Sequence, residues 1–356
     1  MIKVLVGNIF RSKAQTIVNT VNCVGVMGKG LALEFKKQFP EMYADYLTRC
    51  ERGEVKLGVP YLYKGSTPWI LNFPTKDHWR SVAQLDDIVR GLQFLNRNYK
   101  ALGITSIAVP PLGCGQGQLE WHIVGPTLYR HLNRLDIPIE LYAPYGTPHE
   151  ELEIEFLKEE ALATNGHSAT KRLERIKPAW VALVEILNRI ENQRYHWPVS
   201  RTIFQKIAYV ATEKGLPTDL QYSRGSFGPF SRDLKPVITG LVNNGLIYEE
   251  HLGRMFAVKI GPTFEDARKS FSDQLKNWDS VLEKITDLFM RVNDTAKAEI
   301  VATVLYVAHE LHQKNGNKIS EDDVLKSVLA WKQRRKPPLD REEIALTIRN
   351  LAALGW

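Results

Sequence analysis

The chain has 356 residues, of which 44% are hydrophobic and 24% charged, with a formal net charge of +7 and a pI near 9.1. The length favours two domains, and the composition is ordinary for a soluble globular protein. Every apolar run is shorter than the roughly 18 residues of a membrane span, and the segment from Met1 to Gly7 lacks the features of a signal peptide. We therefore expect a cytoplasmic protein without membrane contacts.

The cysteines and the distribution of charge limit the kinds of binding site that we expect in this chain. Cys23, Cys50 and Cys114 are too few for a disulfide framework and lack zinc-type spacing, so we predict buried thiols and no bound metal or cofactor. Residues 1–150 hold 17 Lys and Arg against 12 Asp and Glu, a surplus of 5, whereas residues 151–356 hold 30 against 28, a surplus of 2. We therefore expect a polyanionic substrate in the first part of the chain.

The first 145 residues alternate apolar strand-like runs with helical patterns. The runs predict strands at 2–6, 16–21, 69–73, 106–109 and 139–142. The helical patterns predict helices at 31–39, 43–50, 81–102 and 120–135. This alternation predicts a central α/β sheet with helices on both faces.

Two glycine-rich turns follow predicted strands, one at Gly25–Gly30 and one at Pro110–Gly117. Glycine lets backbone amides approach a ligand closely, and the first turn leads into a helix whose N-terminus carries a positive partial charge. Neither turn has the spacing of a P-loop or of a dinucleotide-binding fingerprint. The two turns therefore predict a site that holds a diphosphate from both sides.

The second half of the chain differs in composition. A polar segment at 164–170 predicts a linker, and the chain then shows helical patterns at 178–191, 200–214, 230–243, 263–291, 295–314, 320–334 and 340–354. Two short apolar runs at 246–249 and 255–259 predict a β-wing after a helix pair. We expect a domain at 1–155, a linker at 156–170 and a mainly helical domain at 171–356 with a winged-helix-like subdomain.

Four motifs in the first half resemble those of ADP-ribose-binding macrodomains. They are Gly7-Asn8-Ile9, Val18 to Asn22 with Gly28-Lys29-Gly30, Asn72 to Lys76, and Pro110 to Gly115. Their order and spacing, together with the long helical extension, resemble more narrowly the DarG family of antitoxins. That resemblance implies a macrodomain fold at residues 1 to about 145, followed by a domain that binds a DarT-like toxin.

The resemblance implies an ADP-ribose site with the adenine near the first strand, the diphosphate between the glycine turns, and the distal ribose beside Asn22. The residues that it places around ADP-ribose are Asn8, Ile9, Asn19, Asn22, Gly28, Lys29, Gly30, Leu31, Thr75, Pro111, Leu112, Gly113, Cys114, Gly115, Gln116 and Gly117. Asn8 departs from the aspartate of many macrodomains. Its amide oxygen still accepts a hydrogen bond from adenine, but without charge assistance.

Lys76 is the catalytic residue that the resemblance implies, because a related protein glycohydrolase uses a lysine at this position to act on the anomeric carbon of the bound ribose. A lysine serves as a nucleophile or a Schiff-base former when its pKa is depressed. That glycohydrolase also has an aspartate in the second glycine loop, where this chain has Gly117. Either Lys76 works without that partner, or the leaving group needs less acid–base help.

The implied substrate is ADP-ribose attached to thymidine in single-stranded DNA. A modified base must leave its stack to enter a pocket, and His78, Trp79 and Arg80 are candidates for contacts with the flanking strand. The turn at 224–230 is interpreted as a structural loop, and the basic run at 332–336 as a solvated helix end.

We therefore expect a bacterial antitoxin that hydrolyses the bond between ADP-ribose and DNA and also binds its cognate toxin. The alternatives are a protein or O-acetyl-ADP-ribose hydrolase, and a non-catalytic reader of ADP-ribose whose C-terminal domain sequesters the toxin. A DNA-binding or autoregulatory role of the C-terminal domain is a further alternative, although its surplus of only 2 positive charges favours toxin binding.

Overall fold

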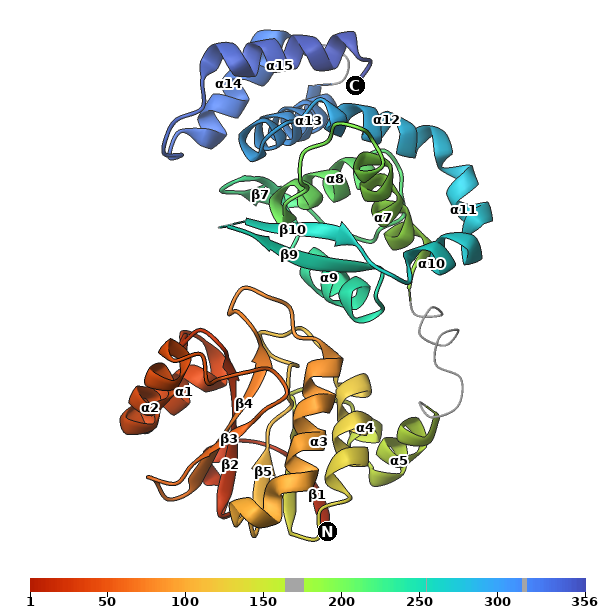
Figure 1. Cartoon of the computed structure of the whole chain (residues 1–356). Helices are drawn as coiled ribbons and strands as arrows, with labels where there is room; N and C mark the ends of the chain where they lie inside the picture. Colours follow the sequence, from red (N-terminus) through yellow and green to blue (C-terminus); the bar gives the residue numbers. More distant parts are fainter. Residues whose placement is uncertain (164–175, 254, 316–318) are drawn as a thin grey trace. The chain divides into compact units, whose positions relative to one another are not determined.

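The computed structural model describes residues 1–163, 176–253, 255–315 and 319–356 (Figure 1). The chain divides into two compact units, Met1–Arg172 and Leu173–Trp356. The polar segment of the predicted linker lies outside the described residues. Helix α5 (Ile154–Ala163) extends past residue 155, where the first domain was predicted to end. The predicted domain limits stay a prediction.

The first unit is built on one mixed sheet of six strands in the order β1-β6-β5-β2-β4-β3. The strands are β1 (Ile2–Val6), β2 (Thr16–Asn22), β3 (Tyr61–Tyr63), β4 (Trp69–Lys76), β5 (Ile107–Val109) and β6 (Ile139–Ala143). All neighbouring pairs are parallel except β3 and β4, which are antiparallel. The predicted central sheet is confirmed, with β3 as a strand that the sequence pattern did not reveal.

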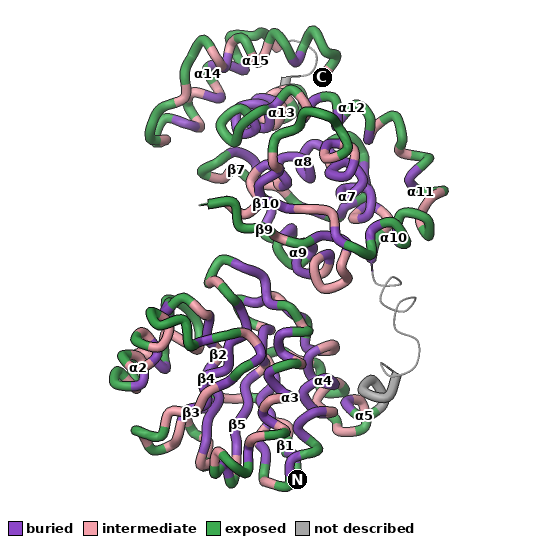
Figure 2. Tube along the Cα trace, viewed as in Figure 1, coloured by how far each residue is buried: buried purple, intermediate pink, exposed green. Residues whose placement is uncertain are grey.

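Helices cover both faces of this sheet. They are α1 (Gly30–Gln38), α2 (Pro40–Glu51), α3 (Leu85–Leu102), α4 (Trp121–Leu132) and α5, with short 3₁₀ turns η1 (Ile9–Arg11) and η2 (His149–Leu152). Consecutive strand residues face opposite ways, so Ile17 packs in the core beneath α1 and α2 while Val18 packs beneath α3 and α4. The inner strands β2, β4, β5 and β6 are accordingly buried along most of their length, whereas the edge strands β1 and β3 are mostly half-buried or exposed (Figure 2).

Local sequence explains where these helices begin and end. Pro40 occupies the first turn of α2, where its missing amide hydrogen costs no hydrogen bond. Gly103 ends α3 in the left-handed conformation with a φ of 78°, which glycine adopts without a steric penalty. The helix predicted from residue 81 begins at Leu85, because Ser81 to Ala83 lie buried in an irregular segment beside the second glycine turn.

The second unit is mainly helical. Its helices are α7 (Pro178–Glu191), α8 (Arg201–Glu213), α9 (Leu234–Asn243), α10 (Phe264–Ser270), α11 (Ser272–Asn277), α12 (Asp279–Met290), α13 (Thr295–Asn315), α14 (Glu321–Lys332) and α15 (Arg341–Ala353). The single helix predicted at 263–291 is wrong in that the chain leaves helical geometry at Phe271 and Trp278, whose ψ values are 19° and 4°. Among the described helices, none is long and apolar enough to cross a membrane.

Two hairpins complete the second unit. One pairs β7 (Ser223–Gly225) with β8 (Gly228–Phe230), and the other pairs β9 (Ile247–Leu252) with β10 (Met255–Ile260). The second hairpin lies where the sequence predicted a β-wing, and it joins the start of α8 through a hydrogen bond from the Val258 amide to the Val199 carbonyl (2.8 Å). Assignment of this region to a winged-helix-like subdomain stays a prediction.

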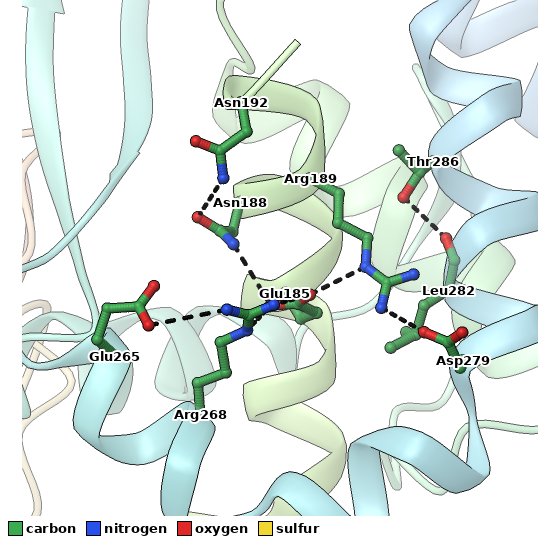
Figure 3. A network of polar contacts seen from close by, with 9 residues as sticks. All are labelled: Glu185, Asn188, Arg189, Asn192, Glu265, Arg268, Asp279, Leu282 and Thr286. Carbon is green, nitrogen blue, oxygen red and sulfur yellow. Dashed lines mark hydrogen bonds and ion pairs between the residues drawn. The ribbon is translucent and has the colours of Figure 1, made fainter.

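A buried carboxylate organises the helices of the second unit (Figure 3). Glu185 of α7 accepts hydrogen bonds from Arg189 Nε and Arg268 Nε, both at 2.9 Å. Arg189 also donates to Asp279 of α12 (2.6 Å). Because buried charges are tolerated when they are paired, this network accounts for a polar position on an otherwise apolar helix and ties α7 to α10 and α12.

Candidate functional site

Three loops meet at the carboxyl edge of the sheet in the first unit. Strands β5, β2 and β4 are adjacent and parallel, so the segments after Val109, Asn22 and Lys76 emerge side by side. The Cys23 amide donates to the Asp77 carbonyl (3.1 Å), which joins the first glycine turn to the end of β4. Lys76 Nζ donates to the Gln116 carbonyl (2.7 Å), which joins the second turn to the same point.

The first glycine turn is held by the buried side chain of Asn22. Its Oδ1 accepts from the amides of Val24 (3.0 Å) and Val26 (3.3 Å), and its Nδ2 donates to the Val26 carbonyl (2.6 Å). The hydroxyl of Tyr46 donates to the same Oδ1 (3.1 Å). Asn22 therefore shapes the turn, besides any contact with a ligand.

The open end of this turn is the start of α1. Gly28, Lys29 and Gly30 are exposed, Leu31 is half-buried, and no side chain of the described residues caps the helix at Lys29. The first amides of a helix lack partners within it and attract anions. The start of α1 is therefore able to accept an anion, and its contact with a diphosphate stays a prediction.

The second turn is closely packed. A Cβ atom on Gly117 would overlap the Gly113 carbonyl oxygen and lie 2.8 Å from the Cβ of Ala83. One on Gly113 would lie 2.6 Å from Leu119. No side chain fits at residue 117 without movement of the backbone, which gives a physical reason for the missing loop carboxylate.

The other predicted residues of the second turn differ in exposure. Pro111 is half-buried and Leu112 fully buried, and burial raises the pKa of the Cys114 thiol to about 12. Gly115 and Gln116 are exposed, with open space around the position of a Cβ on Gly115. The exposed part of this turn is thus the part whose carbonyl receives Lys76.

Lys76 is the last residue of β4 and is 9% exposed. Thr75 beside it is also buried, and its hydroxyl lies 3.5 Å from the Val21 carbonyl of β2. The Lys76 ammonium thereby contacts the second glycine turn, while the carbonyl of the next residue, Asp77, accepts from Cys23 at the first turn. This position makes Lys76 a candidate to act on a ligand held by both turns.

The rings of His78 and Trp79 and the guanidinium of Arg80 lie close together in the segment after Lys76. The His78 ring stacks on Trp79 with centroids 5.5 Å apart, and the Arg80 guanidinium lies 4.6 Å from the Trp79 ring centre. Trp79 is 47% exposed, which is unusual for so large an apolar side chain. A flat aromatic and cationic surface therefore lies next to Lys76.

Two of the predicted asparagines have other surroundings. Asn8 is exposed and its Oδ1 accepts from the Phe10 amide (3.0 Å), while Ile9 next to it is buried. Asn19 is 0% exposed, and its Nδ2 donates to Asn72 Oδ1 (2.9 Å) within the sheet. Asn19 is thus one of several predicted residues, with Ile9 and Leu112, whose side chains are buried. Both contacts with ADP-ribose stay predictions.

Two residues that help to hold the first glycine turn were not predicted from the sequence. Tyr46 of α2 holds Asn22, and the backbone of Asp77 holds Cys23. Neither has a motif, because each acts through a single contact with a residue distant in sequence. Among the described residues, no group of His, Cys, Asp and Glu is arranged to hold a metal ion.

Comparison of the chain with known proteins shows the family to which it belongs. The Macro domain model matches residues 18–128. A Thermus aquaticus protein named DNA ADP-ribosyl glycohydrolase is 31% identical over 318 residues, which are 87% of this chain and 83% of the relative. The chain belongs to the DNA ADP-ribosyl glycohydrolase family. This confirms the family resemblance carried by the four motifs.

Other members of the glycohydrolase family match shorter parts. The Mycobacterium tuberculosis DNA ADP-ribosyl glycohydrolase is 34% identical over 66% of this chain and 65% of its own length. A Thermosipho africanus DNA ADP-ribosyl transferase–glycohydrolase fusion protein is 43% identical over 39% of this chain and 40% of the relative. A solved structure from that organism, DarTG in complex with ADP-ribose, is 43% identical over 44% of this chain and 45% of that chain, with a TM-score of 0.43. The matches thus span less than two thirds of these relatives.

Proposed function

We propose that this protein removes ADP-ribose from thymidine in single-stranded DNA by hydrolysing the N-glycosidic bond. The observation that carries the proposal is the Lys76 ammonium, which donates to the Gln116 carbonyl at 2.7 Å between the two glycine turns. The family relationship supplies the reaction class, since relatives are named for this activity. In the reaction the bond from the ribose anomeric carbon to the base nitrogen breaks, water is added, and free ADP-ribose leaves.

The glycine turns would hold the diphosphate. The exposed backbone of Gly28 to Gly30 at the start of α1 offers amides and a positive helix end, and the exposed Gly115 and Gln116 offer a second wall. Binding the charged diphosphate at fixed positions would leave the distal ribose to be oriented by Asn22 and Lys76. Such orientation is a major part of enzymatic rate enhancement.

Lys76 would act at the anomeric carbon. Its contact with the Gln116 carbonyl fixes the amine beside the second turn, so that a small movement brings Nζ to a bound ribose. Packing at Gly117 excludes a carboxylate from that part of the turn. The proposal therefore assigns Lys76 the main role and relies on a leaving base that needs little general acid catalysis.

The rings of His78 and Trp79, with Arg80, would contact the DNA strand that flanks the modified base. Aromatic faces stack on bases of any sequence, and a guanidinium pairs with phosphate. Trp79 follows shortly after Lys76 in the chain. A modified base that leaves its stack beside Trp79 would therefore lie near the Lys76 amine.

The test is release of free ADP-ribose from single-stranded DNA that carries ADP-ribosylated thymidine. We expect the wild-type chain to release ADP-ribose and Lys76→Ala to be at least about 100-fold slower, with ADP-ribose binding retained by calorimetry. Lys100→Ala, at an exposed position near the end of α3, is the matched control and should retain full activity.

Two results would overturn the proposal. A wild-type chain that binds ADP-ribose but releases none is a reader, and neutralisation would then depend on sequestration alone. Cleavage of ester-linked ADP-ribose on protein, or of O-acetyl-ADP-ribose, without cleavage of the DNA substrate would identify the alternative hydrolase.

We also propose that the second unit binds the cognate DarT-like toxin. The support is the Thermosipho relative, whose name joins a DNA ADP-ribosyl transferase and a glycohydrolase in one chain. Lys76→Ala separates the two activities, because it should still block DNA modification by the purified toxin at a one-to-one ratio. If this variant blocks nothing at excess, direct binding is refuted and removal of ADP-ribose is the sole antitoxin activity.

A further inference from the structure

The two motifs of the second unit that were interpreted as inert lie together in the structure. One is the hairpin β7–β8 with its turn at Ser226 and Phe227, and the other is the basic run Lys332–Lys336 after α14. Lys332 Nζ donates to the Ser226 carbonyl (2.9 Å) and so joins them. Residues more than 100 positions apart therefore form one surface.

Positive charge exceeds negative charge beneath this surface. Glu299 of α13 is buried, and it accepts from Lys332 (2.8 Å) and from Arg335 Nε at both carboxylate oxygens (3.2 Å each). Lys206 of α8 is also buried, donates to the Pro229 carbonyl (2.8 Å), and has its pKa lowered to about 8 by burial and by Lys332. Three cationic groups thus surround a single carboxylate.

The same contacts fix the hairpin. Lys206 holds β8 and Lys332 holds the turn. Gly228 has a φ of 88°, and a Cβ there would lie 2.9 Å from Thr303 Oγ1 and 3.4 Å from Lys206 Nζ, so the backbone packs closely at this point. The adjacent Phe227 is 64% exposed. Its ring is therefore available to stack on a planar partner.

Further cations and one ring belong to the hairpin or lie beside Lys332 in the sequence. Arg334 and Lys336 are exposed just after α14 ends at Lys332. The Arg224 guanidinium lies 5.1 Å from the centre of the Trp331 ring and pairs with Glu310. We define the basic-aromatic surface as Arg224, Phe227, Trp331, Arg334, Arg335 and Lys336.

We propose that the basic-aromatic surface binds the backbone and bases of single-stranded nucleic acid, at a site separate from the predicted ADP-ribose site. Exposed cations would contact phosphates, and Phe227 would stack on a base. An acidic protein segment would match the charge but would offer no succession of planar bases on which the exposed Phe227 ring could stack. The inference does not depend on the proposed hydrolysis, because it concerns unmodified strands.

The test measures binding of a fluorescent, unmodified oligothymidylate to the full chain by anisotropy. Arg334→Glu with Lys336→Glu should weaken binding by about tenfold or more at low salt, and should lower the slope of log affinity against log salt by about 1.4. Phe227→Ala should weaken binding by about fivefold with the slope unchanged. Lys269→Glu with Lys276→Glu, at exposed positions on α10 and α11, is the charge-matched control and should bind as the wild type does.

Three outcomes would overturn the inference. In the first, the Arg334 and Lys336 variant binds DNA as tightly as the wild type and still inhibits the purified toxin. In the second, the control pair loses as much affinity as the Arg334 and Lys336 variant. In the third, the Arg334 and Lys336 variant retains DNA binding but no longer inhibits the toxin, which would assign the surface to a protein partner. Denaturant unfolding of each variant serves as the folding check, since all the substitutions lie in the second unit.

Discussion

The two glycine turns of the first unit are held in different ways. The first is held mainly by hydrogen bonds of the Asn22 side chain, and it leaves space around Gly28 and Gly30, although a Cβ on Gly25 would lie 2.9 Å from Leu47. The second is held by packing at Gly113 and Gly117, which lie against neighbouring atoms with no space for a Cβ. Glycine therefore serves an open backbone at the end of the first turn and close contact with the core in the second.

The largest expected effect tests the packing of the second turn. Gly117→Ala should lower the free energy of unfolding by about 3 kcal/mol, because its Cβ would overlap the Gly113 carbonyl and force the backbone to move. Gly115→Ala, two residues away in open space, should change it by less than about 0.5 kcal/mol. Denaturant unfolding of the two variants measures the difference, and equal stabilities would refute the contrast.

The next effect tests the support of the first turn. Asn22→Ala removes the hydrogen bonds to the turn and to Tyr46, so we expect a loss of about 2 kcal/mol in stability. ADP-ribose affinity should fall about tenfold because the turn is no longer preorganised. Asn8→Ala removes one exposed hydrogen bond and should cost less than about 1 kcal/mol. Calorimetric titration and thermal unfolding would separate the two asparagines, and parallel losses in both variants would contradict this account.

The smallest effect concerns pH and the helix after the second turn. Burial and the neighbouring Arg130 and Arg134 lower the pKa of His131 on α4 to about 4, below its usual 6.5. As pH falls below 6.5 the unfolded chain gains a proton that the folded chain does not, so stability decreases. Between pH 7.0 and 5.5 we expect a loss of about 1 kcal/mol.

His131→Leu should remove this part of the pH dependence while it leaves that of the other titrating groups. Urea unfolding of both proteins at pH 7.0 and 5.5 provides the measurement. An unchanged difference between the two pH values would show that His131 does not have a depressed pKa in the folded state.

Much of the fold was accessible from the sequence because apolar runs and helical periodicity are local signals. Strands β1 and β6 and helix α7 lie where these patterns put them. Strand β3 was not predicted because it consists of only three residues, all half-buried, at the edge of the sheet. The helix predicted at 263–291 is interrupted by two aromatic residues whose conformation depends on tertiary packing.

The features of the candidate site likewise divide into those that local motifs predicted and those that they did not. The motifs indicated the glycine turns and Lys76, but not that Lys76 would contact the Gln116 carbonyl, 40 residues away. They also grouped Asn19 with the predicted ADP-ribose-binding residues, and its side chain lies buried in the sheet beside Asn72. Contacts between distant residues depend on the strand order, which a single sequence does not contain.

The strand order also has a consequence for synthesis of the chain. Strand β1 leaves the ribosome before the other strands of this sheet, and among the described strands it pairs with β6 alone, whose last residue is Ala143. Strand β1 therefore lacks a hydrogen-bonded neighbouring strand until almost the whole first unit has emerged from the ribosome. We expect a nascent chain stalled before residue 139 to be readily cleaved by protease within residues 1–6, and one stalled well beyond residue 172 to resist cleavage there.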